Sequence, residues 1–421
     1  GEVMKITSFE KLNMYKKAEL YFASFCLIYL SSGFGVGVRG GYVLLMYFLC
    51  LFSFVYLRNF KNASKINIPA LFCLLLAVIS FIYNGEDMKQ ILILISYFLT
   101  AMVFCSAYDY EKWFGAYVKI MYVISVCSII LYVLDILIPS FSSYLPTVTN
   151  SMYLKKGTIL FAVTPTKNRN YGCFWEPGAF QTYLVLAFII ETFIYQSKYK
   201  KRITSLLIAL VTTFSTAGYA SMLTAITALL VSGITDKSMS KSTRNTIIIV
   251  LLAAITAFCI IKYLYPQLYG TLFGKVEKYN VEQNDNSSTG VRLNSITKVF
   301  SVFFEHPIFG VGKTKLKDMF KLTYRHTMAT CTYANWFAYF GALFGCMMIA
   351  GLYKFTELFS KKKLIRIILF LTIISSITSE NYVMNPTILM LVFYGFTPTP
   401  KTIDILDTEA RCYKYTGDKF M

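Results

Sequence analysis

Charge and histidine are scarce in this chain of 421 residues, and their scarcity excludes several classes of protein. Only 15% of the residues are Asp, Glu, Lys or Arg, whereas 56% are hydrophobic, so a soluble globular domain is excluded. Disordered and collagen-like chains are excluded as well, because those classes lack the 36 Phe and 32 Tyr residues found here. A protein that crosses a membrane several times remains.

Only two histidines are present, His306 and His326, and no spacing of Cys and His typical of a zinc site accompanies them. We therefore expect no metal and no cofactor. Most of the ten cysteines lie inside apolar runs, where a thiol behaves as a small hydrophobic group. Cys173 and Cys331 instead lie at the edges of two long loops. The sequence does not decide whether these two cysteines form a disulfide.

Long apolar runs are abundant, and a run of about 17 to 25 residues crosses a bilayer as a helix. Twelve runs are candidates, at residues 18–37, 41–57, 67–84, 90–107, 114–138, 179–196, 203–216, 218–234, 246–264, 332–352, 366–381 and 386–400. The predicted fold class is an all-α integral membrane protein with about 12 transmembrane helices. The seventh and eighth runs are separated only by Ser215-Thr216-Ala217-Gly218, and a single span there would invert everything that follows.

Basic residues are distributed unequally between the two sides that twelve spans define. With the N-terminus inside, the short inner connections carry clusters at 198–202 and 361–363, whereas the short outer turns carry few basic residues. Cytoplasmic connections carry the excess of Lys and Arg in membrane proteins. We therefore predict two cytoplasmic termini, one membrane domain at 1–400 and a cytoplasmic tail at 401–421.

Two long loops, at about 139–178 and 265–331, fall on the outer side and are too rich in aromatic and apolar residues to be disordered. The second loop carries apolar residues at helical spacing, namely Ile296, Val299, Phe300, Phe303 and Phe304. This spacing predicts an amphipathic helix that lies on the membrane or covers the bundle. A basic amphipathic stretch follows at 313–321, where lysines alternate with Leu316, Met319 and Phe320.

The first loop contains Lys167 and ends in a segment that runs from Arg169 to Gly178, directly before a span. Glu176-Pro177 is typical of a structural helix start, since Pro suits the first turn and a carboxylate complements the helix dipole. The same segment also suits an anionic substrate, because arginine binds anions through two donors at once. Both interpretations of Glu176 stay open.

The second loop contributes Arg292, Lys313 and His326. Each of the two basic residues is on its own typical of a solvated charge, and the lysines at 313–321 also suit anionic lipid head groups. Arginines in two outer loops can, however, stabilise a pyrophosphate leaving group without a metal ion. His326 is a candidate general base toward a sugar hydroxyl, because histidine titrates near neutrality.

Three phrases of the sequence occur in an order that is more specific than any one of them. They are Arg169 to Phe180, then Phe214-Ser215-Thr216-Ala217-Gly218-Tyr219, then Arg292 followed by Glu305-His306-Pro307-Ile308-Phe309-Gly310-Val311-Gly312. Together they resemble the O-antigen polymerase and ligase superfamily of integral membrane glycosyltransferases.

The resemblance implies a transferase that uses oligosaccharides linked to undecaprenyl pyrophosphate, on the outer face of the bacterial inner membrane, without metal or nucleotide sugar. It also implies that Arg169 and Arg292 bind pyrophosphate or anionic glycan. The family often has a His eleven residues before a Gly, but counting back from Gly341 gives Thr330, and His326 lies four residues earlier. Glu176 is therefore the substitute candidate for the base.

We predict a polymerase for O-antigen or capsule, which joins lipid-linked repeat units and releases undecaprenyl pyrophosphate. The alternatives are a ligase that transfers glycan to lipid A core, and a flippase for the lipid-linked oligosaccharide. A flippase is expected to place charges inside its spans, where this chain has few besides Lys119, Asp135, Glu191 and Glu380. The expected partners are the lipid-linked substrate and the bilayer, with a chain-length regulator protein as a further candidate and no nucleic acid.

Overall fold

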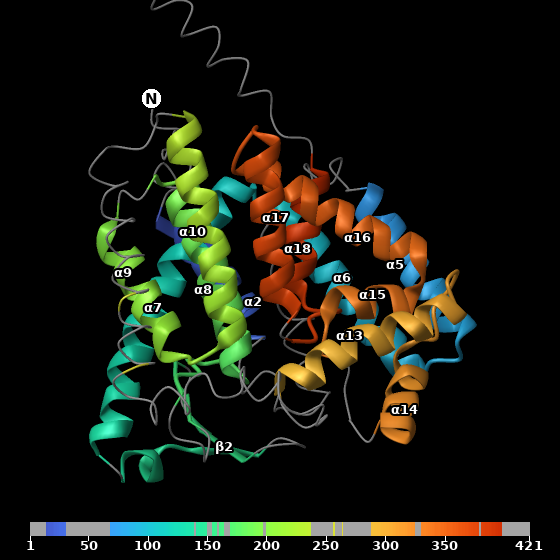
Figure 1. Ribbon diagram of the computed structural model, residues 1–421, viewed down its shortest axis with the longest axis horizontal. Coiled ribbons are helices and arrows are strands. Elements are labelled where there is room, and N and C mark those ends of the chain that lie inside the picture. Colours follow the sequence, from blue (N-terminus) through green and yellow to red (C-terminus); the bar gives the residue numbers. More distant parts are fainter. Residues whose placement is uncertain are drawn as a thin grey trace, which may run out of the picture.

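The computed structural model consists of a bundle of helices with one small sheet at its edge (Figure 1). It describes residues 14–30, 68–138, 140–149, 154–157, 160–163, 169–196, 199–236, 288–324, 330–378 and 380–397, and the single residues 256 and 263. The expected span at 41–57, most of that at 246–264 and the tail at 401–421 lie outside the described residues.

Most of the expected spans correspond to helices. The first half of the chain forms α2 (Met14–Tyr29), α5 (Ile68–Tyr83), α6 (Met88–Ala107), α7 (Tyr110–Leu137), α8 (Pro177–Phe193), α9 (Lys200–Thr212) and α10 (Thr216–Asp236). The second half forms α13 (Ser288–Glu305), α14 (Lys313–Tyr324), α15 (Thr332–Phe340), α16 (Ala342–Phe355), α17 (Lys363–Thr378) and α18 (Pro386–Phe396). Short 3-10 turns occur at Phe141–Tyr144 (η2) and Thr356–Leu358 (η3).

Three of the described helices are long and apolar enough to cross a bilayer, namely α6, α7 and the Thr216–Gly233 part of α10. Shorter apolar helices, α5, α8 and α18, accompany them. The length and composition of these helices support the class of helical membrane protein. The number of twelve spans and the orientation of the termini remain predictions.

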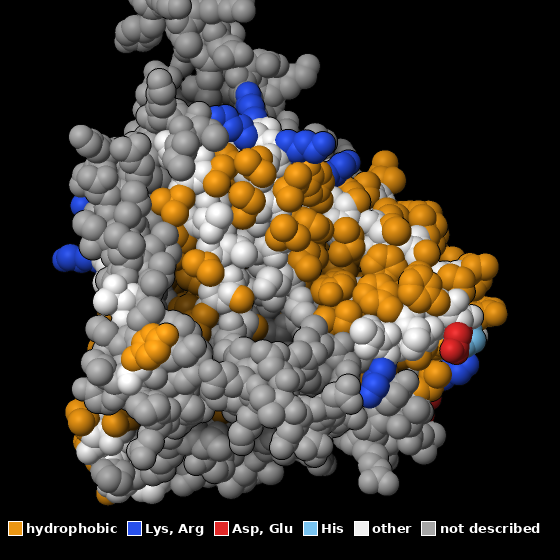
Figure 2. Space-filling model, viewed as in Figure 1, with side chains coloured by type: hydrophobic (Ala, Val, Ile, Leu, Met, Phe, Trp, Pro, Cys, Tyr) orange, Lys and Arg blue, Asp and Glu red, His pale blue; other side chains and the backbone are white. Residues whose placement is uncertain are grey.

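The surface of the bundle is apolar where a soluble protein would be polar. One stripe of α5 is exposed and consists of large aliphatic side chains, Leu71, Leu75, Ile79 and Ile82. The other side of α5 is buried in the bundle through Cys73, Ala77 and Phe81. Figure 2 shows apolar side chains spread over the upper and right-hand parts of the described surface, with a row of Lys and Arg side chains above them. This distribution is that of a surface in contact with lipid.

Helix α8 lies at the centre of the bundle, since its residues from Pro177 to Thr192 are all buried. A helix that is apolar on every side is stable only where other helices surround it. Glu176 occupies the position before the first helical residue and Pro177 is the first residue of the helix. The interpretation of Glu176-Pro177 as a helix start is therefore confirmed.

The apolar run at 203–234 is divided into two helices that run in opposite directions. Arg202, near the start of α9, forms an ion pair with Glu191 near the end of α8. The N–H of Asn170, which precedes α8, donates to the carbonyl oxygen of Thr212 at the end of α9. Gly218, in the first turn of α10, packs against the first turn of α8. Thus α9 is antiparallel to α8, and α10 returns alongside it.

The first long loop contains a three-stranded antiparallel sheet in the order β1 (Thr147–Thr149), β2 (Leu154–Gly157) and β3 (Ala162–Val163). The prediction of an all-α chain is wrong for this loop. Thr147 pairs with Lys156, which in turn pairs with Val163. Short segments rich in Thr and Val favour extended backbone, and their backbone groups then bond to one another in place of water.

The expected span at 332–352 is two helices, because the chain breaks at Gly341 between α15 and α16. Gly341 has φ of +87°, and a Cβ built there would lie 1.9 Å from the carbonyl oxygen of Ile308. No residue other than glycine fits such a position without displacing backbone. The break therefore lies where the helix pair α15 and α16 packs against Ile308 of the second long loop.

Both amphipathic helices predicted in the second loop are confirmed as α13 and α14. Val299 is fully buried in α13, whereas Phe304 is 72% exposed, so the buried face is narrower than the predicted apolar stripe. In α14, Leu316 and Phe320 are buried, and Lys315 and Lys317 on either side of Leu316 are exposed. We call the end of the bundle that carries α13, α14 and the sheet the loop end.

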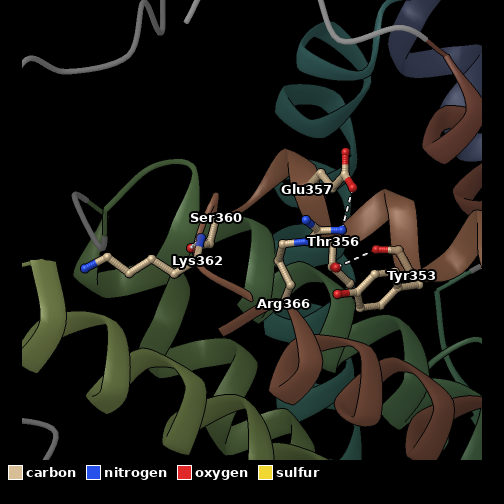
Figure 3. A network of polar contacts seen from close by, with 6 residues as sticks. All are labelled: Tyr353, Thr356, Glu357, Ser360, Lys362 and Arg366. Atoms are coloured by element: carbon tan, nitrogen blue, oxygen red, sulfur yellow. Dashed lines mark hydrogen bonds and ion pairs between the residues drawn. The ribbon is translucent and has the colours of Figure 1, made fainter. Parts of the chain in front are cut away.

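The opposite end joins α16 to α17 through η3 and a turn with local contacts (Figure 3). Arg366 forms an ion pair with Glu357 and lies over the ring of Tyr353, with 4.7 Å from its Cζ to the ring centroid. The N–H of Lys362 donates to Ser360 Oγ at 3.2 Å. These partners lie within about one helical turn of the connection they stabilise.

Candidate functional site at the loop end

Arg169 closes the end of α9. Its Nε donates to the carbonyl oxygen of Thr213 and its Nη2 to that of Phe214, both at 2.9 Å. The last carbonyl groups of a helix have no partner within it and carry the negative end of the helix dipole, so a guanidinium is favourable there. Phe214 has φ of +46°, a conformation that such bonds help to hold.

Asn170 joins the same loop to two helices. Its side-chain amide donates to Ser128 Oγ of α7 at 3.2 Å and to Thr212 Oγ1 of α9 at 3.0 Å. Its Oδ1 accepts from the N–H of Gly172 at 2.8 Å, and the residue is fully buried. A buried amide whose hydrogen bonds are all made fixes the local backbone in one geometry. Arg169 is therefore held both by its own bonds to the end of α9 and by its neighbour Asn170.

Glu176 leads from this loop into α8 without capping the helix through its side chain. Its neighbour Trp175 donates from Nε1 to Glu380 Oε2 at 3.1 Å, although the two residues lie 205 positions apart. The ring of Trp175 also packs against Tyr382, with 5.5 Å between ring centroids. The first long loop thus contacts the connection between α17 and α18.

Glu380 is only 6% exposed and lies where three segments of the chain meet. Its carbonyl oxygen accepts from Thr332 Oγ1 at 2.6 Å, and Thr332 Oγ1 accepts from the N–H of Tyr382 at 2.8 Å. Burial raises the pKa of Tyr382 well above its ordinary value, and the charges of Glu380 and Glu176 act in the same direction. Glu380 and the buried ring of Tyr382 therefore both contact Trp175, the neighbour of Glu176 at the start of α8.

Residues 305–312 connect α13 to α14 and form a junction with the break between α15 and α16. The N–H groups of Val311 and Gly312 donate to the carbonyl oxygens of Ala338 and Tyr339, which the break at Gly341 leaves without helical partners. The bonds measure 2.8 and 3.2 Å. The junction thus attaches the helix pair α13 and α14 to the α15–α16 break.

The remaining predicted site residues are only partly described. Lys167 and His326 lie outside the described residues, and Arg292 is described only as part of the backbone of α13. Lys313 begins α14, and its Nζ donates to Gln90 Oε1 in α6 at 2.9 Å. The structure thus places Glu176 next to Trp175, which bonds Glu380, and places Lys313 against the first turn of α6.

Sequence patterns did not assign Glu380, Trp175 or Tyr382 to the site, although Glu380 was noted as one of the few charges in or near the spans. A usable signal existed for Glu380, since an ionisable residue close to a membrane span suggests a functional site by default. Trp175 and Tyr382 carry no comparable signal, because their significance depends on contacts between distant segments.

Cys173 and Cys331 are both free and buried, so the disulfide that the sequence left open is not formed. Burial raises the pKa of the Cys173 thiol to about 12 and that of Cys331 to about 11, which makes both unreactive at neutral pH. Within the part of the chain that the structure describes, no three His, Cys, Asp or Glu residues come together as a metal site would require.

Fold and site together define a helical membrane protein with an organised polar site at one end. A family model described as O-antigen ligase matches residues 203–335, from α9 into α15. The match includes the α9–α10 break and the junction at 305–312, and it confirms the resemblance to the O-antigen polymerase and ligase superfamily. No curated protein matches the chain.

Proposed function

We propose that the chain is a bacterial polysaccharide polymerase of the inner membrane. It joins oligosaccharide repeats carried on undecaprenyl pyrophosphate, and the loop end faces away from the cytoplasm. The observation that supports the proposal is the contact of Trp175, the neighbour of Glu176, with Glu380, which also accepts a hydrogen bond from Thr332 in the segment matched by the family model.

In the proposed reaction, Arg169 and Arg292 hold the pyrophosphate of the growing chain. Charge-assisted contacts from arginine stabilise the negative charge that develops on the leaving group. The acceptor hydroxyl oxygen forms a bond to the anomeric carbon as the bond from that carbon to the phosphate oxygen breaks. The leaving pyrophosphate takes the electron pair, so a direct displacement inverts the anomeric configuration.

Glu176 is the proposed general base that takes the proton of the acceptor hydroxyl. It is half-buried and does not cap α8, and Trp175 beside it is fixed by Glu380. At residue 330, where relatives often have a histidine, the chain has Thr330, whose hydroxyl cannot act as a base at neutral pH. His326 remains the second candidate for the base.

The experiment is a gel ladder of surface polysaccharide from the native host with the gene deleted and then restored. Surface lipid capped by a single repeat after deletion is expected from a polymerase. Restoration with Glu176→Gln should give no long polymer, whereas Glu357→Gln at the opposite end should restore the full ladder. A full ladder with Glu176→Gln would assign the base elsewhere.

A ligase is the second candidate, and the description of the matching family model favours it. In a ligase mutant, long polymer accumulates on the lipid carrier and is absent from the surface acceptor. A flippase would instead leave single lipid-linked repeats trapped on the cytoplasmic side. The same deletion strain therefore separates the three activities.

A further inference from the structure

The turn between α5 and α6 holds the start of α14 through a buried carboxylate. Glu86, which is 8% exposed, accepts from the N–H of Thr314 at Oε1 and from the Thr314 hydroxyl at Oε2, both at 2.6 Å. The two residues lie 228 positions apart. The first N–H groups of a helix have no partner within it and carry positive partial charge, which makes a carboxylate favourable there.

The residues around this carboxylate leave it little freedom. Gly312 has φ of +75°, and a Cβ built there would lie 2.7 Å from Glu86 Oε1. Lys313 donates to Gln90 in the first turn of α6. Burial lowers the pKa of Lys313, and the charge of Glu86 opposes that shift. The charge of the buried Glu86 thus favours the charged form of Lys313 at the start of α14.

The last turn of α5 and the residue after that helix also contact the junction before α14. Ser80 Oγ lies 2.6 Å from the carbonyl oxygen of Phe309 and 2.9 Å from that of Tyr339. Asn84 Nδ2 donates to the carbonyl oxygen of Phe309 at 3.2 Å. The α5–α6 turn therefore binds the chain on both sides of Gly310 and Gly312, whose positive φ angles set its direction.

We propose that Glu86 is a positioning residue for the transfer reaction, and that Lys313 supports it and is not a substrate ligand. By fixing the first turn of α14, Glu86 anchors the junction at 306–312 that follows α13, the helix that carries Arg292. The inference rests on the proposed function, because it concerns the placement of residues which that function uses. Glu86 lies outside the segment matched by the family model.

The test compares Glu86→Ala with Asp87→Ala in the full-length protein. Asp87 is the adjacent acid on the same turn, is exposed and makes no side-chain capping bond, which makes it a matched control. Two quantities are measured: the kinetics of polymerisation with lipid-linked repeats, and hydrogen exchange of the peptide that spans 310–324.

Glu86→Ala should lower kcat about 10- to 100-fold with little change in KM, as expected when reacting groups are misplaced by about 1 Å. The Thr314 amide should exchange faster in the same variant. Glu86→Gln should have a kcat and an exchange rate between those of the wild type and Glu86→Ala. Its side-chain oxygen still accepts from Thr314, but the negative charge near Lys313 is lost. Asp87→Ala should leave both quantities unchanged.

An unchanged kcat in Glu86→Ala, with faster exchange at Thr314, would overturn the inference, and so would a lowered kcat without faster exchange. If Glu86→Ala does not accumulate in the membrane, Thr314→Val decides, since it removes one hydrogen bond at nearly constant volume. A wild-type rate in Thr314→Val would then overturn the inference. A wild-type chain without polymerase activity would overturn the proposed function instead, which is a different result from an active wild type.

Discussion

The loop end and the opposite end close their helices in different ways. At the opposite end, Arg366 pairs with Glu357 across a short turn, and that partner is 43% exposed. At the loop end, Arg169 bonds the carbonyl oxygens after α9 from a different segment of the chain, and Glu86 bonds the start of α14 from 228 positions away. The first arrangement is local, whereas the second joins segments that are distant in sequence.

This difference determines how many segments of the chain a substitution will affect. An exposed ion pair contributes little to stability, because water and salt replace it. A buried carboxylate or guanidinium that bonds the end of a helix cannot be replaced by water without opening the packing around it. Substitutions of Arg169 or Glu86 should therefore act on several segments at once, and substitutions in the Arg366–Glu357 turn on one.

Gly341→Ala should have the largest effect. Its Cβ would overlap the carbonyl oxygen of Ile308, so we expect a loss of about 3 to 5 kcal/mol and almost no protein in the membrane. Gly85→Ala is the control, since Gly85 has φ of +67° but nothing within 4 Å of the added Cβ. That control should cost about 1 to 2 kcal/mol. Immunoblots of membranes compare the two, and equal accumulation would contradict the account of the break.

Arg169→Ala should abolish long polymer while leaving the protein in the membrane at a reduced level. It removes two bonds to the α9–α10 break and the proposed contact with pyrophosphate. Arg169→Lys should rescue poorly, because an ammonium group cannot replace the planar fork of donors. Arg366→Ala is the matched control, and a polysaccharide gel reads all three. A normal ladder with Arg169→Ala would contradict the prediction that the loop-end arginine is needed for polymer and Arg366 is not.

Trp175→Phe should lower the rate of polymerisation by about tenfold. It keeps an aromatic ring but removes the N–H that bonds Glu380, which leaves a buried carboxylate with one bond fewer. Initial rates on purified protein provide the measurement, with Glu357→Gln as the control at the opposite end. Equal rates for Trp175→Phe and wild type would indicate that the bond does not position Glu176.

Arg366→Ala should have the smallest effect, within about 1 kcal/mol of the wild-type stability. Its ion pair with Glu357 is partly exposed, and its contact with the ring of Tyr353 is the main loss. Thermal denaturation in detergent at low and high salt measures the effect. A large loss of stability would show that local contacts at this end matter as much as the distant contacts of the loop end.

Sequence patterns predicted the parts of the fold that depend on neighbouring residues. The start of α8 follows from Glu176-Pro177, and the amphipathic helices α13 and α14 follow from the periodicity of their apolar residues. Capping and periodicity are local properties, and the same physics acts in the sequence and in the folded chain.

Two features could not be predicted because their causes are distant in sequence. The apolar run at 332–352 is continuous, and a single glycine within a helix is tolerated, so nothing in the run itself indicates a break. The break forms because residues 307–312 bond to the carbonyl oxygens that it exposes. The bond from Trp175 to Glu380 likewise depends on how α8, α17 and α18 pack together.

The junction between Gly341 and residues 305–312 limits which segments can be exchanged between related proteins. Because the junction completes the hydrogen bonds of α15 and α16, the second loop is not a detachable module. A chimera that replaces residues 288–324 alone would leave those helices with mismatched partners. A stable graft would have to carry residues 80–90 and the helix pair at 332–355 with it.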